Sequence, residues 1–305
     1  MASLAHEARE SALSPADVLR LEPEEADELL DRLESSVPAH PGLLHLASGR
    51  SREAVVFGDS HGDWRSTVAV AQHFLEAPAQ RLLIGLGDYV DRAPSDCAEG
   101  SVANALYLLA LAAAFPDRVF LLQGNHETSK RIPVLPHDLP EEVDGLWGPM
   151  VERYARIQGL LERGPYAALS ENGAYLAHAG FPRVPEGGPL SKVFDNPSEE
   201  VLFDVVWADC AAARGHHVGG TQFTEVDFER FLAWSGARVF LRGHDPDLTG
   251  RPVFHDRVLT LHTSRVYERF GGVVFARLPL DRPIGSIADL KVEQTGTAGM
   301  VYPEP

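Results

Sequence analysis

Six polar side chains, spread over much of the chain, are of the types that bind metal ions through oxygen or nitrogen. They are Asp59, His61, Asp88, Asn125, His178 and His244. The set contains no thiolate, and this mixture of carboxylate, amide and imidazole groups suits manganese, iron or zinc. A purely oxygen set would instead have indicated magnesium or calcium. Carboxylates can bridge two ions, and ion pairs about 3.5–4 Å apart are widely used to hydrolyse phosphate esters, so these residue types indicate metal-assisted phosphate chemistry.

The elements that must position these residues are short apolar runs, each followed at once by glycine, aspartate, asparagine or histidine. These runs cover residues 54–57, 81–86, 118–123, 174–177, 238–241 and 258–261, with a last apolar run at 272–278. Continuous apolar runs bounded by turn residues are typical of buried strands. Helical stretches at 101–115 and 151–164 lie between them, which predicts an α/β fold with a more strand-rich second half. Such folds place ligands at the carboxyl ends of strands, so the polar strand ends predict one shared site.

The composition limits the classes of partner. The chain has 305 residues, 44 acidic and 27 basic side chains, and a formal charge of −17. This acidic balance argues against nucleic acid or an anionic membrane as a partner, because both would be repelled. Cys97 and Cys210 lack ligand-like spacing, and no signal sequence or run of about 18 apolar residues is visible. We therefore expect a soluble, cytoplasmic protein.

Three motifs occur in a fixed order: GDSHG (58–62), GDYVDR (87–92) and GNHE (124–127). They are followed by HAG (178–180) and RGH (242–244). Together they resemble the signature of the phosphoprotein phosphatase family of calcineurin-like metallophosphoesterases, in its bacterial serine/threonine form. The resemblance covers about 54 to 270. It implies a four-layer α/β/β/α sandwich with two central mixed sheets, and a centre of two metal ions (manganese, iron or zinc).

The resemblance also divides the chain into three parts. Residues 1–50 are expected to be an N-terminal helical extension, 51–285 the metallophosphoesterase catalytic domain, and 286–305 a C-terminal tail. Within the extension, Ser14-Pro15 is a typical helix start, and Leu29, Leu30 and Leu33 share one helix face.

Metal ligands are assigned by the same resemblance. It implies that Asp59 and His61 hold the first ion, that Asp88 bridges both ions, and that Asn125, His178 and His244 complete the second. His262 falls at a position where the family uses no metal ligand, so it is left out of the set.

Catalytic and phosphate-binding roles follow in the same way. His126 resembles the general acid of the family, and Asp91 would hydrogen-bond its imidazole. Arg92 resembles one of two arginines that grip the substrate phosphate. Arg214, which precedes a glycine, is the expected second arginine, and Tyr267 the expected active-site tyrosine. The competitors for the second arginine are Arg183, Arg242 and Arg265.

The resemblance implies a metal-dependent phosphatase that hydrolyses phosphoserine and phosphothreonine in proteins or peptides, by direct attack of water bound to the two metals. Diadenosine tetraphosphate hydrolases carry comparable motifs and form the main alternative, but the VDR motif and Glu127 favour the protein phosphatase. A generic phosphodiesterase is a third possibility. The non-enzymatic alternative is a metal-free scaffold that binds phosphoproteins, against which the intact ligand set argues. One departure from the family is Ala93, where glycine usually follows VDR.

Overall fold

The computed structural model of the chain describes residues 13–47, 49, 51–183, 188–213 and 221–295. Two five-stranded sheets lie at its centre. The first has the order β1 (Leu43–Leu46), β5 (Ala167–Ser170), β6 (Ala174–Ala177), β9 (Val239–Arg242) and β10 (Val258–Thr260). The second has the order β12 (Lys291–Thr295), β11 (Val273–Pro279), β2 (Glu53–Phe57), β3 (Arg81–Gly85) and β4 (Val119–Leu121). Seven of these ten strands correspond to the apolar runs of the sequence, whereas β1, β5 and β12 match none of the predicted runs.

Both sheets mix parallel and antiparallel neighbours. In the first sheet only β5 and β6 are antiparallel, and in the second β11 is antiparallel to both β12 and β2. The remaining neighbours are parallel. Parallel strands joined by helices must be covered on both faces, and this explains why their sequences are apolar without alternation. The two central mixed sheets expected from the sequence are confirmed.

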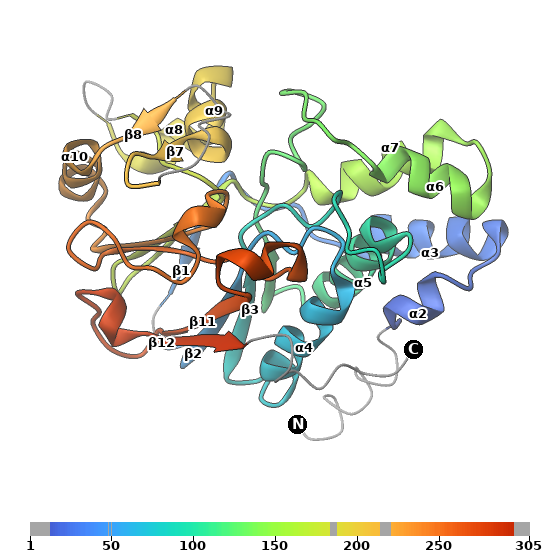
Figure 1. Cartoon of the computed structure of the whole chain (residues 1–305), viewed down its shortest axis with the longest axis horizontal. Coiled ribbons are helices and arrows are strands. Elements are labelled where there is room, and N and C mark those ends of the chain that lie inside the picture. Colours follow the sequence, from blue (N-terminus) through green and yellow to red (C-terminus); the bar gives the residue numbers. More distant parts are fainter. Residues whose placement is uncertain (1–12, 48, 50, 184–187, 214–220, 296–305) are drawn as a thin grey trace.

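The sheets face each other across one apolar core, and helices cover their outer faces. Val56 points into the core between the sheets, whereas its neighbour Val55 points to the helical side of the second sheet. That side is covered by α3 (Pro23–Ser36), α4 (Trp64–Leu75), α5 (Gly100–Ala114), α6 (Leu139–Trp147) and α7 (Val151–Leu161). The outer face of the first sheet is covered by α8 (Leu190–Asp195), α9 (Glu199–Trp207) and α10 (Glu225–Ser235). Figure 1 shows these two groups of helices on opposite sides of the molecule, and the layers therefore run α/β/β/α.

Several smaller elements complete the fold. They are the strand pair β7 (Asp209–Cys210) and β8 (Gln222–Phe223), the 3₁₀ helices η1 (Pro246–Leu248), η2 (Arg265–Phe270) and η3 (Ile287–Asp289), and the short helix α2 (Pro15–Val18) near the start of the chain. None of the helices in the described part of the chain is both long and apolar enough to span a membrane.

The N-terminal helices form as expected from the sequence. Ser14 caps α2 through a reciprocal pair of contacts with Asp17. Leu29, Leu30 and Leu33 of α3 are buried against the helices α5, α6 and α7. On its acidic face, Asp27 and other carboxylates pair with arginines of α7, including Arg153 at 2.7 Å. The acidic face of α3 is therefore partly an ion-paired interface.

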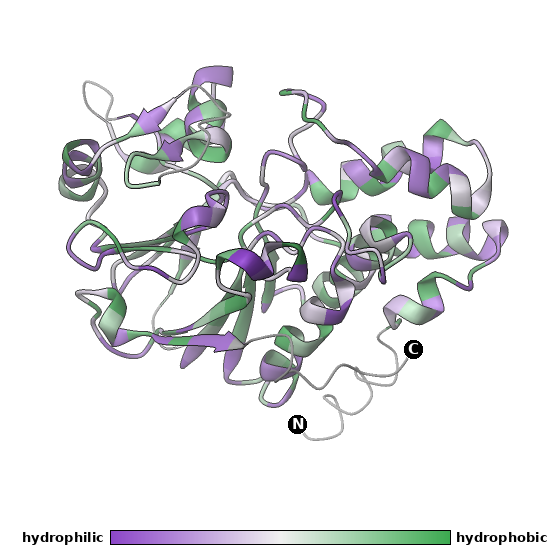
Figure 2. Cartoon of the chain, in the orientation of Figure 1, coloured by the Kyte–Doolittle hydropathy of each residue, from purple (hydrophilic) through white to green (hydrophobic). Residues whose placement is uncertain are grey.

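Both ends of the described chain contribute edge strands. The strand β1 lies within residues 1–50 and pairs with β5, and β12 lies within 286–305 and pairs with β11. Figure 2 shows β12 as mainly hydrophilic, in contrast to the central strands. Charged residues on an exposed edge discourage pairing with another chain.

Candidate active site

The predicted polar residues follow strands that end at one edge of the two sheets. Asp59 and His61 follow β2, Asp88 follows β3, Asn125 and His126 follow β4, His178 follows β6, and His244 follows β9. Parallel strands bring their carboxyl ends to the same edge, so residues far apart in the sequence meet there. The structure thereby brings together the residues that the sequence predicted to share a site.

Hydrogen bonds between these loops hold them at fixed positions. The amide of Asp59 donates to the carbonyl of Gly87 (3.1 Å), and that of His61 donates to the carbonyl of Asp88 (2.9 Å). The carboxylate of Glu127 accepts hydrogen bonds from the amides of Asp88 (2.7 Å), Tyr89 (2.9 Å) and Gly124 (2.9 Å). Glu127, for which the sequence analysis assigned no contact, therefore joins the loop after β3 to the loop after β4.

The loop backbone is unusual because several non-glycine residues adopt the left-handed region. They are Asp59, His61, Asp88, Asp91, Arg92 and His244, with φ between 41° and 70°. Non-glycine residues in the left-handed region are strained, and residues in this conformation are often concentrated at functional sites. Ala93 is not among the described residues with positive φ, so a methyl group at the usual glycine position is compatible with this loop.

Two glycines allow close approach at the site. A Cβ atom on Gly124 would overlap Oδ1 of Asp88, and one on Gly243 would overlap Oδ1 of Asp59. The glycine of the RGH motif therefore makes room for the Asp59 carboxylate in this chain.

Asp88 belongs to two clusters of possible ligands, which explains how two ions can share it. One cluster is His61, Asp88 and His126, and the other is Asp59, Asp88 and His178, with ligand atoms within 4.8 Å of one another in each cluster. The Oδ2 atom of Asp88 lies 3.6 Å from Nε2 of His61 and 3.5 Å from Nε2 of His178. These separations leave room for an ion between the side chains.

The environment of the cluster favours bound cations. Burial, and then the charges of Asp59 and Glu127, raise the pKa of Asp88 well above its usual value. Burial also acts to raise the pKa of Asp59, but the imidazoles of His262 and His178 overcome it and lower the pKa. Buried carboxylates this close together need positive charge nearby.

The amide of Asn125 supports the same conclusion. One of its terminal atoms lies 2.8 Å from Nε2 of His178 and 3.2 Å from Oδ2 of Asp88. If that atom is the amide oxygen, it faces only acceptors, an arrangement that a cation between them would stabilise. The residues present therefore fit a metal centre.

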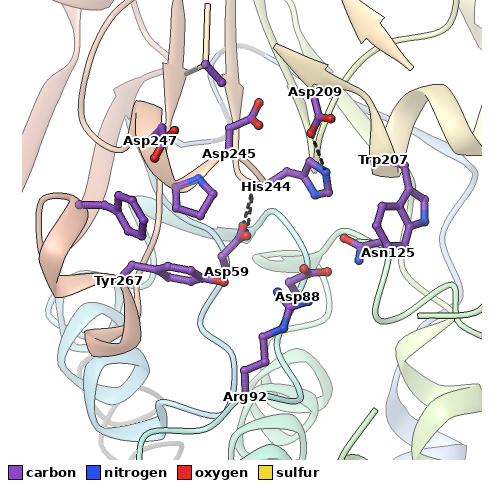
Figure 3. Close-up of a pocket in the computed structure, with 13 residues that line it drawn as sticks. Asp59, Asp88, Arg92, Asn125, Trp207, Asp209, His244, Asp245, Asp247 and Tyr267 are labelled. Carbon is purple, nitrogen blue, oxygen red and sulfur yellow. Dashed lines mark hydrogen bonds and ion pairs between the residues drawn. The ribbon is translucent and has the colours of Figure 1, made fainter. Parts of the chain in front are cut away.

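His244 lies at the rim of this cluster. Its backbone amide donates to the Asp59 carboxylate at 3.1–3.2 Å, and its ring is 5.3 Å from the ring of His178. Its Nε2 atom is 3.5 Å from Oδ1 of Asp209, as Figure 3 shows. The ring thus lies between the cluster and Asp209, and its metal-binding role stays a prediction.

The expected acid pair is present and buried. Nδ1 of His126 donates to Oδ2 of Asp91, and Oδ1 of Asp91 accepts from the amides of Asp138 (2.6 Å) and Leu139 (2.9 Å). A second imidazole, His137, contacts the same carboxylate at 3.1 Å. Burial acts to raise the pKa of Asp91, but the hydrogen bonds from His126 and His137 lower it, so the carboxylate is ionised.

A pocket of about 320 Å³ opens over the cluster. Figure 3 shows the Arg92 side chain extending toward Asp88, with Tyr267 beside Asp59. Both residues line the pocket, together with Trp207 and Phe270. Arg92 and Tyr267 therefore line the pocket above the cluster, and their role in phosphate binding stays a prediction.

The position of the second phosphate-binding arginine is not settled by the structure, because Arg214 lies outside the described residues. Two of its competitors have structural partners. Arg242 is fully buried against Asp245 and backbone carbonyls, and Arg265 pairs with Asp63 at 2.8 Å. The third competitor, Arg183, lies on the surface, 3.7 Å from the Asp204 carboxylate.

Sequence reasoning missed two residues near the cluster. His262 is buried with Nε2 3.2 Å from Oδ2 of Asp59, and His137 contacts Asp91. His262 follows an apolar strand in the same way as the predicted ligands do, so the signal was present in the sequence. His137 lies in a proline-rich segment for which the sequence predicted no helix or strand, and no local pattern distinguished it.

Comparisons with known proteins agree with this geometry. The family profile "Calcineurin-like phosphoesterase" matches residues 54–248. A probable serine/threonine-protein phosphatase of Encephalitozoon cuniculi is 28% identical over 83% of this chain and 54% of its own length. The PP2A-like serine/threonine-protein phosphatase PPG1 of Candida albicans is 27% identical over 62% of this chain and 44% of its own. The chain thus spans about half the length of these curated relatives.

Solved structures share the fold at low sequence identity. A protein serine/threonine phosphatase from Saccharomyces cerevisiae, similar to human PP5, superposes with a TM-score of 0.75 at 20% identity, covering 93% of this chain and 92% of that one. A cold-active protein-tyrosine phosphatase of a psychrophilic Shewanella species gives 0.57 at 15% identity, covering 85% and 84%. The family match extends over most of the chain and includes the strands and loops that build the cluster. The chain therefore belongs to the calcineurin-like phosphoesterase family.

Proposed function

We propose that this chain is a metal-dependent phosphoprotein phosphatase that hydrolyses phosphoserine and phosphothreonine monoesters. The observation that carries this proposal is the pair of ligand clusters that share Asp88, below a pocket lined by Arg92. One of these clusters includes His126, which is hydrogen-bonded to Asp91. The relatives with serine/threonine phosphatase names support the substrate class. A phosphorylated protein or peptide is the proposed partner.

The proposed metal ligands are those predicted from the sequence. Asp59, His61, Asp88, Asn125, His178 and His244 would hold two ions of manganese, iron or zinc. When bound, the ions would neutralise phosphate oxygens and make a water molecule acidic enough to attack near neutral pH.

The side chains around the cluster have separate tasks in this reaction. Arg92 binds phosphate oxygens through its planar guanidinium group, with Tyr267 beside it and Arg214 as the proposed second arginine. His126 protonates the alkoxide of serine or threonine as it leaves, on the side opposite to the attacking water. Asp91 holds Nδ1 of that imidazole, so that Nε2 is directed toward the ligand cluster, 3.8 Å from Oδ2 of Asp88. The reaction is a single in-line displacement without a phosphoenzyme.

The remaining assignments belong to the same proposal. Residues 51–285 would form the catalytic domain, 1–50 the N-terminal helical extension and 286–305 the C-terminal tail. The extension and the tail would each add an edge strand, β1 and β12, to the sheets of that domain, and the family match lies inside it. A cytoplasmic location is supported by Cys97 and Cys210, which are both free and buried.

The proposal is tested with a substrate panel. The purified chain is supplied with manganese, iron or zinc in turn and given phosphoserine, phosphothreonine and phosphotyrosine peptides and diadenosine tetraphosphate. We expect the phosphoserine and phosphothreonine peptides to be the best substrates. Faster turnover of diadenosine tetraphosphate than of any peptide would instead support the dinucleotide hydrolase.

Two variants test the site itself. Asp88→Asn and His126→Asn should each abolish peptide hydrolysis while circular dichroism shows a folded protein. The matched controls Asp117→Asn and His45→Asn change exposed residues of the same types and should retain full activity. Full turnover in both Asp88→Asn and His126→Asn would refute the proposed function.

A further inference from the structure

His262 is held at the same sheet edge as the predicted ligands by hydrogen bonds of the backbone around it. The strand β10 ends at Thr260, which pairs with Arg242 of β9. The amide of Thr263 then donates to the carbonyl of Gly58 (2.7 Å), directly before Asp59, and the carbonyl of His262 accepts from Val274 (2.7 Å). These contacts fix the His262 backbone opposite the loop that carries Asp59.

The hydrogen bonds of Thr249 determine which nitrogen of His262 carries the proton. The hydroxyl of Thr249 donates to the carbonyl of Pro246 at 2.7 Å, so toward His262 the same oxygen acts as an acceptor. It lies 2.8 Å from Nδ1 of His262, and that nitrogen therefore carries the hydrogen. In the neutral imidazole, Nε2 is left with a lone pair.

Nε2 of His262 points into the cluster. The side chain is fully buried, and its Nε2 atom has no hydrogen-bond partner among the described residues. It lies 3.2 Å from Oδ2 of Asp59. Two acceptors at this distance in a buried place repel each other unless a positive charge lies beside both.

His61 is anchored in the same way as His262. Nδ1 of His61 donates to the carbonyl of Val90 (2.9 Å), and its buried Nε2 also lacks a hydrogen-bond partner in the described part of the chain. The ring of Tyr267 lies 5.7 Å from the ring of His61 and 4.6 Å from that of His262. Both imidazoles are therefore anchored at Nδ1, beside one tyrosine, with Nε2 available as a ligand.

We propose that Nε2 of His262 is an additional ligand of the ion held by Asp59 and His61. The inference rests on the proposed metal centre and adds an imidazole to the first ion, at a position where the resembling family has none. Metal–nitrogen and metal–oxygen bonds of about 2.0–2.2 Å place neighbouring ligand atoms about 3.0–3.5 Å apart, which the 3.2 Å separation from Asp59 matches.

A simpler arrangement is an ion pair in which a protonated His262 neutralises Asp59 without binding metal. The two arrangements differ in what removal of the imidazole does to metal affinity. Loss of a ligand lowers the affinity for the first ion and leaves the affinity for the second ion unchanged. Losing only an ion partner leaves Asp59 more negative, so metal binding is unchanged or becomes tighter.

The test measures metal binding directly, without an activity assay. The full chain is prepared free of metal as wild type, His262→Ala, His61→Ala and Asn125→Ala, with His40→Ala as a control at a half-buried histidine that packs on Phe120. Each protein is titrated with Mn²⁺ or Zn²⁺ against a fluorescent chelator, and bound metal is counted by mass spectrometry. Circular dichroism in the presence of chelator verifies folding.

We expect wild type and His40→Ala to bind two ions. His262→Ala should lower the affinity for one of the two ions by about 100-fold or more. Loss of a residue that only orients a ligand lowers metal affinity by about 10- to 100-fold, so a ligand should cost at least the upper value. The double variant His262→Ala/His61→Ala should have a lower affinity for the first ion only. The double variant His262→Ala/Asn125→Ala should have a lower affinity for both ions. A second variant, Thr249→Val, keeps the imidazole but removes its anchor and should weaken the same ion about 10-fold.

Unchanged affinities for both ions in His262→Ala, with wild type binding two ions and hydrolysing phosphopeptides, would overturn this inference and leave the proposed function intact. Wild type that binds no ion would overturn both. If His262→Ala does not fold, Thr249→Val decides the matter, because wild-type affinity in that variant contradicts a ligand role.

Discussion

Asp91 and His126, 35 residues apart in the sequence, form a fully buried carboxylate–imidazole pair next to Asp88. The carboxylate fixes the orientation of the ring, and two backbone amides in turn fix the carboxylate. The pair is thus preorganised for proton donation.

If His126 is the general acid, Asp91→Asn should lower kcat by about 100-fold or more, within the usual contribution of general acid catalysis. The loss should be large for a phosphoserine peptide and much smaller for p-nitrophenyl phosphate, whose leaving group needs no proton. Steady-state kinetics on both substrates measure this difference.

A double-mutant cycle with His126→Asn supplies the control. Because the two residues act as one unit, Asp91→Asn should cost little once His126 is absent. If the two substitutions lowered kcat by independent factors that multiply in the double variant, the proposed pair would be contradicted.

Asp138 connects the proline-rich loop to Arg92. Its carboxylate accepts the backbone amide of Arg92 at 2.9 Å. Asp138→Ala removes one hydrogen bond, worth about 1 kcal/mol, that fixes the backbone of Arg92. The variant should therefore raise KM about five-fold with little change in kcat. Inhibition by inorganic phosphate should weaken by a similar factor.

Glu141→Ala, at an exposed position three residues further on, is the matched control and should leave KM unchanged. A fall in kcat without a rise in KM for Asp138→Ala would show that the contact does not serve phosphate binding.

Glu142 makes stability depend on pH. Burial raises its pKa to about 7, although it accepts hydrogen bonds from Ser101 Oγ (2.6 Å) and the amide of Val102 (3.2 Å). Because the folded pKa lies above the ordinary 4.5, the protonated form is favoured in the folded state. This contribution is fully present below pH 4.5 and is lost as pH rises toward 7.

Between pH 4.5 and pH 8, the free energy of unfolding of wild type should therefore fall by about 2 kcal/mol more than that of Glu142→Gln. Urea denaturation of both proteins, with a chelator present to exclude metal effects, measures the difference. Glu141→Gln is the exposed control and should follow wild type. Equal pH slopes in wild type and Glu142→Gln would disprove the prediction.

The N-terminal helices should contribute to stability rather than to chemistry. Leu30 of α3 is fully buried in the core beneath α5 and α7. Leu30→Ala should lower the free energy of unfolding by about 2–4 kcal/mol and leave kcat of the folded fraction unchanged. The exposed Val226→Ala is the control. A large loss of kcat without destabilisation would instead assign this helix a catalytic role.

Much of the fold was predictable because it depends on local patterns. Buried parallel strands are apolar throughout and end in turn residues, so the strands before Asp59, Asp88 and Asn125 stood out in the sequence. The layered sandwich came from the family resemblance, since apolar runs do not specify which strands pair.

Other features depend on long-range contacts that leave no local trace. The strand β1 is four residues long and pairs with β5 more than a hundred positions away, and α6 starts inside a segment that looked like a loop. His137 reaches Asp91 only because that segment folds back over the site. His262 had the right local pattern but was set aside on the basis of the family resemblance.

The left-handed backbone at Asp59, Asp88, Asp91 and Arg92 has a consequence for attempts to engineer this protein. Glycine would relieve the torsional penalty at each position, but only by deleting a side chain proposed to act on substrate or metal. A library screened solely for heat resistance would accordingly enrich inactive clones at these sites. Substitutions that raise thermal stability should be sought in the helices and edge strands, and the residues of these loops should be left unchanged.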